Sequence, residues 1–349
     1  MIKKRTCALI FGDNIAYLDH IAPLAALLDI PLVVTENELF ELANRYYPDL
    51  VILHYDWIEV TKRLVPEYDV IITNLPAFFL RKLFRVAEMM AGKKILSIWV
   101  PHGNSDKNFP FEGLPHETIA IIYGEQMEQI FKKRGVYEQI PHVLTVGNYR
   151  LSYYKRMKTF YDKMLASEVL PHLSSEKKTI LYAPTWNDGG DTSTLFVTAP
   201  SLIDKLTPKY NLIIKLHPNT SILDMNGLQA LMREYGDSVL FLEQYPPIYP
   251  LLNLADFYIG DISSIGYDFL QFDKPMLFLH PDPNLPLHQV GIQVDDLNKI
   301  DQHVEKEQSE YLEKRKALYQ EAFAKAPERD KLREMIFNTS EKALDARVI

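Results

Sequence analysis

The chain has 349 residues, 47% of them hydrophobic, which is enough for about two domains with ordinary cores. Its 38 basic and 46 acidic residues give a net charge of −8, which argues against a general nucleic-acid-binding protein. The single cysteine, Cys7, excludes a disulfide framework or a thiolate metal cluster. The apolar run after the basic N-terminus is too short for a signal peptide, and no stretch has the length of a membrane span. We therefore expect a cytoplasmic protein.

Short apolar runs alternate with helical patterns along the first half of the chain, which is typical of parallel βαβ construction. We predict strands at Thr6–Phe11, Pro31–Val34, Leu50–Leu53, Val70–Thr73, Ile95–Val100, Thr118–Ile122 and Val143–Val146. A charged and aromatic helical stretch at 148–170 follows without a strand pattern. We therefore place a domain boundary near residue 150.

A second series of strands is predicted in the other half, at Lys178–Ala183, Leu212–Lys215, Val239–Leu242, Phe257–Gly260 and Met276–Leu279. After about Lys299 the pattern changes to long charged helices. The predicted fold class is therefore α/β, with Rossmann-like domains at 1–150 and 151–300 and a helical segment at 301–349.

Polar turns directly follow the predicted strands in both halves. They are Pro101–Lys107, Pro184–Trp186, His217–Asn219 and Asp261–Ser264. Open α/β sheets bind ligands at the carboxyl ends of their strands. We therefore expect a ligand cleft between the two domains, lined by turns from both.

His102 is the first candidate for chemistry, because a histidine titrates near neutrality and can take a proton from an attacking hydroxyl. A buried, hydrogen-bonded structural histidine is an equally good interpretation of one His-Gly pair. Gly103 would allow close approach of a substrate, and Lys107 would help to neutralise a phosphate, although a loop lysine is usually just solvated. Asn104 lies between Gly103 and Lys107, and the three residues form a candidate binding turn beside His102.

The turns of the second half favour an anionic ligand. Lys215 is a cation at the end of a buried strand and needs an anionic partner. Pro218 favours an extended conformation for His217, so that its ring would be held rigidly. Ser263 and Ser264 precede a helix expected to begin at about Ile265, where hydroxyls and backbone N–H groups would bind phosphate. Taken alone, that turn is more often an ordinary helix cap.

Other common chemistries are absent from the sequence. There is no P-loop, no Gly-x-Gly-x-x-Gly turn and no nucleophile elbow. The histidines lack the helical pairing of a zinc protease, and 187–191 lacks the carboxylate spacing of a calcium loop. We predict neither a metal ion nor another cofactor.

Taken as a set, these motifs resemble the CDP-glycerol glycerophosphotransferase family of teichoic-acid synthesis. The resemblance covers about residues 95 to 280. It is carried by His102-Gly103, Leu181–Trp186, Lys215–Pro218 and Asp261–Ser264, followed by Tyr267-Asp268-Phe269 and Lys274-Pro275. It implies two Rossmann-like domains of the glycosyltransferase-B type, with the nucleotide held mainly by the second domain.

The resemblance also implies a role for each candidate residue. His102 would deprotonate the acceptor hydroxyl, and His217 would act near the donor pyrophosphate. Phosphate oxygens would be held by Ser263, Ser264 and Lys215. The remaining residues on the donor side would be Pro184, Thr185, Asp261 and Asp268, with the two aspartates positioning the turn or meeting donor hydroxyls.

The implied reaction is attack of a hydroxyl of a lipid-linked or surface-glycan acceptor on the β-phosphorus of a CDP-polyol, with release of CMP. Two alternatives stay open. One is a nucleotide-sugar glycosyltransferase or hydrolysing epimerase on the same scaffold. The other is a non-catalytic, nucleotide-binding scaffold.

Residues 78–94 carry a concentration of cations in an otherwise acidic chain. As a helix, the segment would place Phe79, Leu83, Val86 and Met90 on one face, with Arg81, Lys82 and Arg85 elsewhere. Such a helix can lie on an anionic membrane. The alternative is an ordinary helix that covers the sheet, and both hold if the basic edge stays exposed.

Overall fold

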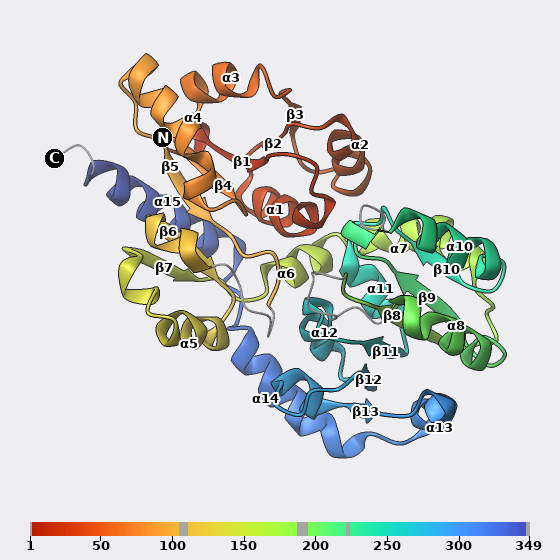
Figure 1. Cartoon of the computed structure of the whole chain (residues 1–349). Helices are drawn as coiled ribbons and strands as arrows, with labels where there is room; N and C mark the ends of the chain where they lie inside the picture. Colours follow the sequence, from red (N-terminus) through yellow and green to blue (C-terminus); the bar gives the residue numbers. More distant parts are fainter. Residues whose placement is uncertain (1, 105–110, 187–194, 221–223, 347–349) are drawn as a thin grey trace. The chain divides into compact units, whose positions relative to one another are not determined.

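The computed structural model describes residues 2–104, 111–186, 195–220 and 224–346, which form two compact units that each contain one parallel sheet (Figure 1). The first unit contains the described residues up to Arg156 together with the segment from Glu321 onward. The second unit runs from Met157 to Gln320. The two sheets confirm the predicted α/β fold with two Rossmann-like sheets, whereas the cleft expected between the domains stays a prediction.

The sheet of the first unit has seven strands in the order β3-β2-β1-β4-β5-β6-β7, and every neighbouring pair is parallel. Strands β1, β4, β5 and β6 are buried along their whole length, as expected for strands covered on both faces. The strands are β1 (Thr6–Ile10), β2 (Leu32–Val34), β3 (Ile52–His54), β4 (Val70–Thr73), β5 (Leu96–Trp99), β6 (Ile119–Ile122) and β7 (His142–Thr145).

Helices connect these strands and cover the sheet. The α-helices are α1 (Ile15–Leu28), α2 (Asn37–Tyr46), α3 (Val60–Glu67), α4 (Ala77–Ala91), α5 (Glu125–Lys133) and α6 (Tyr149–Arg156). The 3₁₀ helices are η1 (Ile2–Arg5), η2 (Phe111–His116) and η3 (Tyr137–Gln139).

The second sheet has six strands in the order β10-β9-β8-β11-β12-β13, again all parallel. The chain passes outward from β8 to β10 and then returns to β11 on the other side of β8. The point between β8 and β11 is therefore a topological switch, where open sheets bind ligands. The strands are β8 (Thr179–Ala183), β9 (Asn211–Lys215), β10 (Leu240–Leu242), β11 (Phe257–Gly260), β12 (Met276–Leu279) and β13 (Ile292–Val294).

The helices of this unit include α8, which packs over β9 and contributes to the core of the unit. The α-helices are α7 (Lys158–Glu168), α8 (Leu195–Leu206), α10 (Met225–Tyr235), α11 (Ile248–Leu254), α12 (Ser264–Phe269), α13 (Ile300–Glu305) and α14 (Leu312–Ala322). The 3₁₀ helices are η4 (Leu170–His172), η5 (Leu270–Phe272), η6 (Pro286–Val290), η7 (Leu297–Lys299) and η8 (Ser309–Tyr311). None of the helices in the described ranges has the length and apolar character needed to span a membrane.

The end of the chain returns to the first unit, where α15 (Arg329–Asp345) packs against α1 and β5. Arg329 donates from Nε to the carbonyl of Leu27 at 3.0 Å, so that its guanidinium satisfies an unpaired carbonyl at the end of α1. The N–H of Ala324 donates to the carbonyl of Tyr123 at 3.0 Å. The returning segment therefore completes the first unit.

Candidate active site

Two of the predicted turns meet at the switch point of the second sheet. Ala183 is paired with Gly260, so the Pro184-Thr185 turn and Asp261 follow neighbouring strands. The Thr185 N–H donates to both carboxylate oxygens of Asp261, at 2.9 and 3.1 Å. Pro184, Thr185 and Asp261 are all buried. A buried carboxylate needs such donors, and here they fix the two turns to each other.

The serines of the Asp261 turn stay half-buried at the start of α12. Ser263 is the N-cap residue, and its hydroxyl accepts from the N–H of Ile265 at 3.4 Å. Ser264 is the first residue of the helix, one position earlier than predicted. Further along, the buried Asp268 accepts from the Tyr249 hydroxyl at 2.7 Å. Both aspartates therefore have positioning contacts, and the serines remain within reach of solvent.

Tyr258 lies on β11, just before this turn, and His288 lies close to the Asp261 carbonyl. Neither residue was predicted from the sequence. Burial first, and then the charge of Asp261, raises the pKa of Tyr258, so its phenol keeps its proton. The buried His288 stacks on Phe278, with ring centroids 4.7 Å apart, and its Nε2 lies 3.4 Å from the Asp261 carbonyl. Burial lowers the pKa of His288 and favours its neutral form. The tyrosine lies within the apolar strand β11 and the histidine in the short 3₁₀ helix η6, so neither formed a motif.

Lys215 and His217 follow one another at the end of β9. The Lys215 side chain is buried, and its Nζ donates to the carbonyl of Leu216 at 3.0 Å. His217 is half-buried and stacks on Trp186, with ring centroids 5.8 Å apart. The Asn219 N–H donates to its Nδ1 at 3.1 Å. Since Nδ1 accepts this hydrogen bond, the proton of the neutral ring is on Nε2.

In the first unit, His102 follows β5 on a backbone that side chains hold in place. The Tyr123 hydroxyl donates to the carbonyl of Pro101 at 3.2 Å, and Asn74 donates to the carbonyl of Val100 at 2.8 Å. The His102 imidazole reaches solvent, yet it lies among enough protein atoms for desolvation to lower its pKa, to about 4. The neutral form, which can accept a proton, therefore predominates at neutral pH.

The residues after His102 have mostly structural contacts. Gly103 has a φ of +129°, a conformation that glycine adopts more readily than any other residue. Asn104 is buried, and its amide donates to Gln126 at 2.8 Å and to the carbonyl of Ala322 at 3.4 Å. These contacts fix the end of the turn. Lys107 lies outside the described residues.

No cluster of three or more histidine, cysteine or acidic side chains suited to a metal ion occurs within the described ranges. In the second unit, the candidate site consists of the hydroxyls of Ser263 and Ser264, the Lys215 ammonium group and the His217 imidazole. In the first unit it contains a neutral imidazole. Such groups bind phosphate oxygens and accept a proton from a hydroxyl.

A family profile described as CDP-glycerol:poly(glycerophosphate) glycerophosphotransferase matches residues 116–349, which is more than half of the chain. The chain belongs to this family. The matched region contains Thr185, Lys215, His217 and the turn from Asp261 to Ser264. The resemblance inferred from the motifs is confirmed.

Curated relatives carry names from teichoic-acid synthesis. The teichoic acid glycerol-phosphate primase of Bacillus subtilis (strain 168) is 32% identical over 174 residues, which cover 49% of this chain and 42% of the primase. The teichoic acid poly(ribitol-phosphate) polymerase of Bacillus spizizenii is 26% identical over 188 residues, covering 52% of this chain and 28% of the polymerase. The match spans less than half the length of each of these relatives.

Among solved structures, the wall teichoic acid polymerase TagF has a TM-score of 0.67 to this chain at 17% identity. The superposition covers 99% of this chain and 90% of the TagF chain. At this identity the similarity establishes a common fold. It confirms the predicted glycosyltransferase-B class.

Proposed function

We propose that the protein is an enzyme that transfers glycerol phosphate, or a related polyol phosphate, from a CDP-polyol to a hydroxyl of a lipid-linked or surface-glycan acceptor, releasing CMP. The observation that carries this proposal is membership of the glycerophosphotransferase family across the region that contains the second-unit turns. Two relatives, a glycerol-phosphate primase and a poly(ribitol-phosphate) polymerase, give it further support.

The second unit, close to residues 151–300, would hold the donor. The Lys215 ammonium and the hydroxyls of Ser263 and Ser264 would bind the pyrophosphate oxygens, and His217 would donate from Nε2. Pro184, Thr185, Asp261 and Asp268 would position these groups through the contacts described above. Because these hydrogen-bonding groups of the protein are in place before the CDP-polyol binds, they would stabilise charge on the transferred and leaving phosphates without reorganisation.

The first unit, close to residues 1–150, would serve the acceptor, with Gly103, Asn104 and Lys107 beside His102. The acceptor oxygen forms a bond to the β-phosphorus, and its proton passes to the His102 imidazole. The bond from the β-phosphorus to the oxygen that bridges to the α-phosphate breaks, and CMP leaves with the bonding electrons. A neutral histidine suits this step, because the base must be unprotonated before attack.

A panel of donors tests this assignment against the nucleotide-sugar alternatives. Calorimetric titration with CDP-glycerol, CDP-ribitol, UDP-N-acetylglucosamine and GDP-mannose should show binding of at least one CDP-polyol and at least tenfold weaker binding of the sugars. Tighter binding of a nucleotide sugar would replace the proposal with a glycosyltransferase or epimerase function. A CDP-polyol that binds but is never consumed with any acceptor would indicate a binding scaffold.

We also propose peripheral contact of residues 78–94 with the inner face of the cell membrane, and hence a cytoplasmic location. The buried face of α4 contains Ala77, Leu80 and Ala87, so the helix does cover the sheet. Phe79 and Met90, expected on the apolar face, are 67% and 81% exposed. Exposed aromatic and sulfur side chains beside cations are typical of a helix that contacts an anionic membrane.

A further inference from the structure

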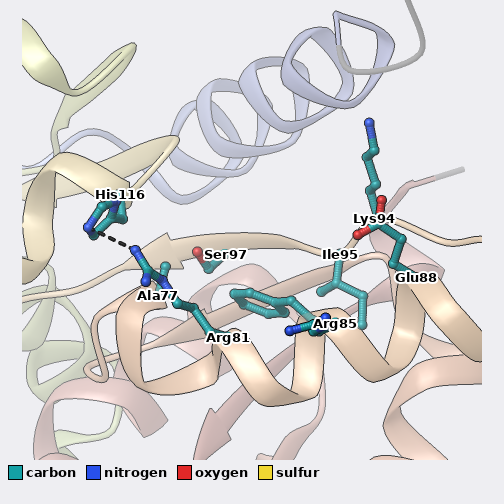
Figure 2. A pocket seen from close by; sticks show the side chains of 9 residues that line it. Ala77, Arg81, Arg85, Glu88, Lys94, Ile95, Ser97 and His116 are labelled. Carbon is teal, nitrogen blue, oxygen red and sulfur yellow. Dashed lines mark hydrogen bonds between the residues drawn. The ribbon is translucent and has the colours of Figure 1, made fainter.

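A groove of about 680 Å³ lies in the first unit between α4 and the start of β5, with His116 of η2 at one end (Figure 2). Its lining includes the half-buried Phe84 and the buried Ile95 and Ser97. The Ser97 hydroxyl is already used, since it donates to the buried Glu117 at 2.9 Å. The volume is that of an ordinary small-molecule site. None of the candidate active-site residues lines it.

The rim of this groove is cationic. Arg81, Arg85 and Lys94 line it, and Glu88 is the one carboxylate among its lining residues. Figure 2 shows Arg81 pointing toward His116 at one end, where its Nη2 lies 3.0 Å from the imidazole Nε2. Neither Arg85 nor Lys94 has a side-chain ion pair or hydrogen bond to any part of the chain that the structure describes. In a chain with a net charge of −8, such a concentration of cations favours an anionic ligand.

An exposed aromatic surface adjoins the same end of the groove. The Phe78 ring stacks on the His116 ring, with centroids 6.4 Å apart. The Arg81 guanidinium lies 4.9 Å from the centre of the Phe78 ring. Phe78 is 49% exposed and Phe79 is 67% exposed. If the anion in the groove carries an apolar group, that group would contact the Phe78 and Phe79 rings.

We propose that this groove is a second anion-binding site, which holds a phosphate group carried on an apolar body. The arginine guanidinium groups match two phosphate oxygens at once, and Lys94 adds a point charge. The site is separate from the proposed donor site in the second unit. The inference therefore stands whether or not the enzyme uses a CDP-polyol, and its test needs no turnover.

The test is calorimetric titration with dodecyl phosphate below its critical micelle concentration, in parallel with inorganic phosphate and the uncharged dodecyl maltoside. The variant combines Arg85→Gln and Lys94→Gln. A matched control combines Lys62→Gln and Lys82→Gln, two exposed cations that do not line the groove. Both double variants lose two positive charges, so a difference between their affinities for dodecyl phosphate reflects binding in the groove and not the change in net charge.

We expect dodecyl phosphate to bind the wild type and the control pair equally, and the groove pair at least tenfold more weakly. Dodecyl maltoside should not bind at these concentrations. Inorganic phosphate should bind more weakly than dodecyl phosphate, because it lacks the apolar body. Equally tight binding of inorganic phosphate would show that the groove takes a free phosphate and would overturn the apolar part of the proposal. Equal losses in both pairs, equal binding of the uncharged detergent, or no binding of either phosphate would overturn the proposal.

Discussion

His102 combines an imidazole that reaches solvent with a backbone that cannot easily move. Tyr123 holds the carbonyl of Pro101, and the His20 Nδ1 lies 3.0 Å from the same tyrosine oxygen. Burial, followed by the charge of Arg150, lowers the pKa of His20 and keeps it neutral. As the proposed base, His102 would keep its position as the pH changes, because Tyr123 and His20, which support its backbone, stay uncharged.

The pH dependence of turnover should therefore reflect the protonation of the His102 imidazole. Its folded-state pKa lies below the ordinary value of about 6.5, so the base is present at neutral pH and is lost as the pH falls toward about 4. We predict that kcat/KM has its acidic limb below pH 6.5. We also predict that His102→Ala lowers kcat by roughly a hundredfold or more and leaves donor affinity near the wild-type value. An acidic limb at or above pH 6.5, or full activity of His102→Ala, would contradict the role of this residue.

The phosphate contacts proposed for the second unit give a prediction about donor affinity. Lys215→Ala and Ser264→Ala should each weaken CDP or CDP-polyol binding, with Lys215→Ala losing about 1.5 to 3 kcal/mol because a charge-assisted contact disappears. Lys209→Ala is a control, since Lys209 precedes the same strand but forms an exposed ion pair with Glu305. The measurement is calorimetric titration, with circular dichroism to verify folding. Unchanged affinity in both Lys215→Ala and Ser264→Ala would remove the phosphate-site assignment.

At the level of the elements, the predicted strands of the first sheet all lie within two residues of their observed positions. Continuous apolar runs between polar turns suffice for such a prediction, because central parallel strands are buried on both faces. β13 was missed, since its three residues, Ile292–Val294, form too short a pattern and follow a 3₁₀ helix. On α4, packing against neighbours selected a different buried face from the one the periodicity favoured. The sequence pattern therefore locates a helix such as α4, whereas packing against neighbouring elements decides which of its faces is buried.

The return of the chain to the first unit depends on two glycines. Gly124 and Gly147 lie against the backbone of Ala322–Ala326, and a Cβ on Gly147 would lie 2.6 Å from the nitrogen of Ala326. Gly147 also has a φ of +64°. A side chain at this position would therefore meet both conformational strain and a fixed backbone.

We predict that Gly147→Ala destabilises the protein by at least about 2 kcal/mol, which is the sum of left-handed strain and displacement of the returning segment. Gly135→Ala is a matched control, because Gly135 has a φ of +67° but nothing within 4 Å of its added Cβ. That variant should lose only the strain, about 1 kcal/mol. Denaturant unfolding measures both. Equal destabilisation of the two variants would show that the contact with the C-terminal segment does not matter.

The exposed side chains of α4 lead to a prediction about membranes. Sedimentation with anionic liposomes should be detectable at low salt, should fall as salt is added, and should drop when Arg81, Lys82 and Arg85 are changed to glutamine. Lys82→Gln alone leaves the groove lining intact, so a lower sedimentation of that variant separates this surface effect from binding in the groove. Neutral vesicles are the control. Equal, negligible sedimentation of both proteins with either vesicle at low salt would exclude a membrane contact through α4.

For the whole molecule, the sequence located the turns of the proposed donor side but not the side chains that support them. The turns at Thr185 and Asp261 were expected at strand ends, and the strand order explains why they meet, since β8 lies beside β11. Tyr258 and His288 could not be predicted, because their positions depend on packing between distant segments. The segment from Glu321 onward also packs on a distant part of the chain, because it belongs to the first unit. Its charged helical pattern did not indicate which unit it would join.

Transfer of a polyol phosphate is tested by measuring release of CMP in the presence and absence of an acceptor. The protein would be incubated with CDP-glycerol or CDP-ribitol and a short glycerol-phosphate-terminated, lipid-linked acceptor, and CMP and extended acceptor would be quantified by chromatography. We predict acceptor-dependent release of one CMP for each polyol phosphate added, and the loss of this release in His102→Ala. Intact CDP-glycerol and CDP-ribitol after incubation, together with consumption of a UDP-sugar under the same conditions, would contradict it.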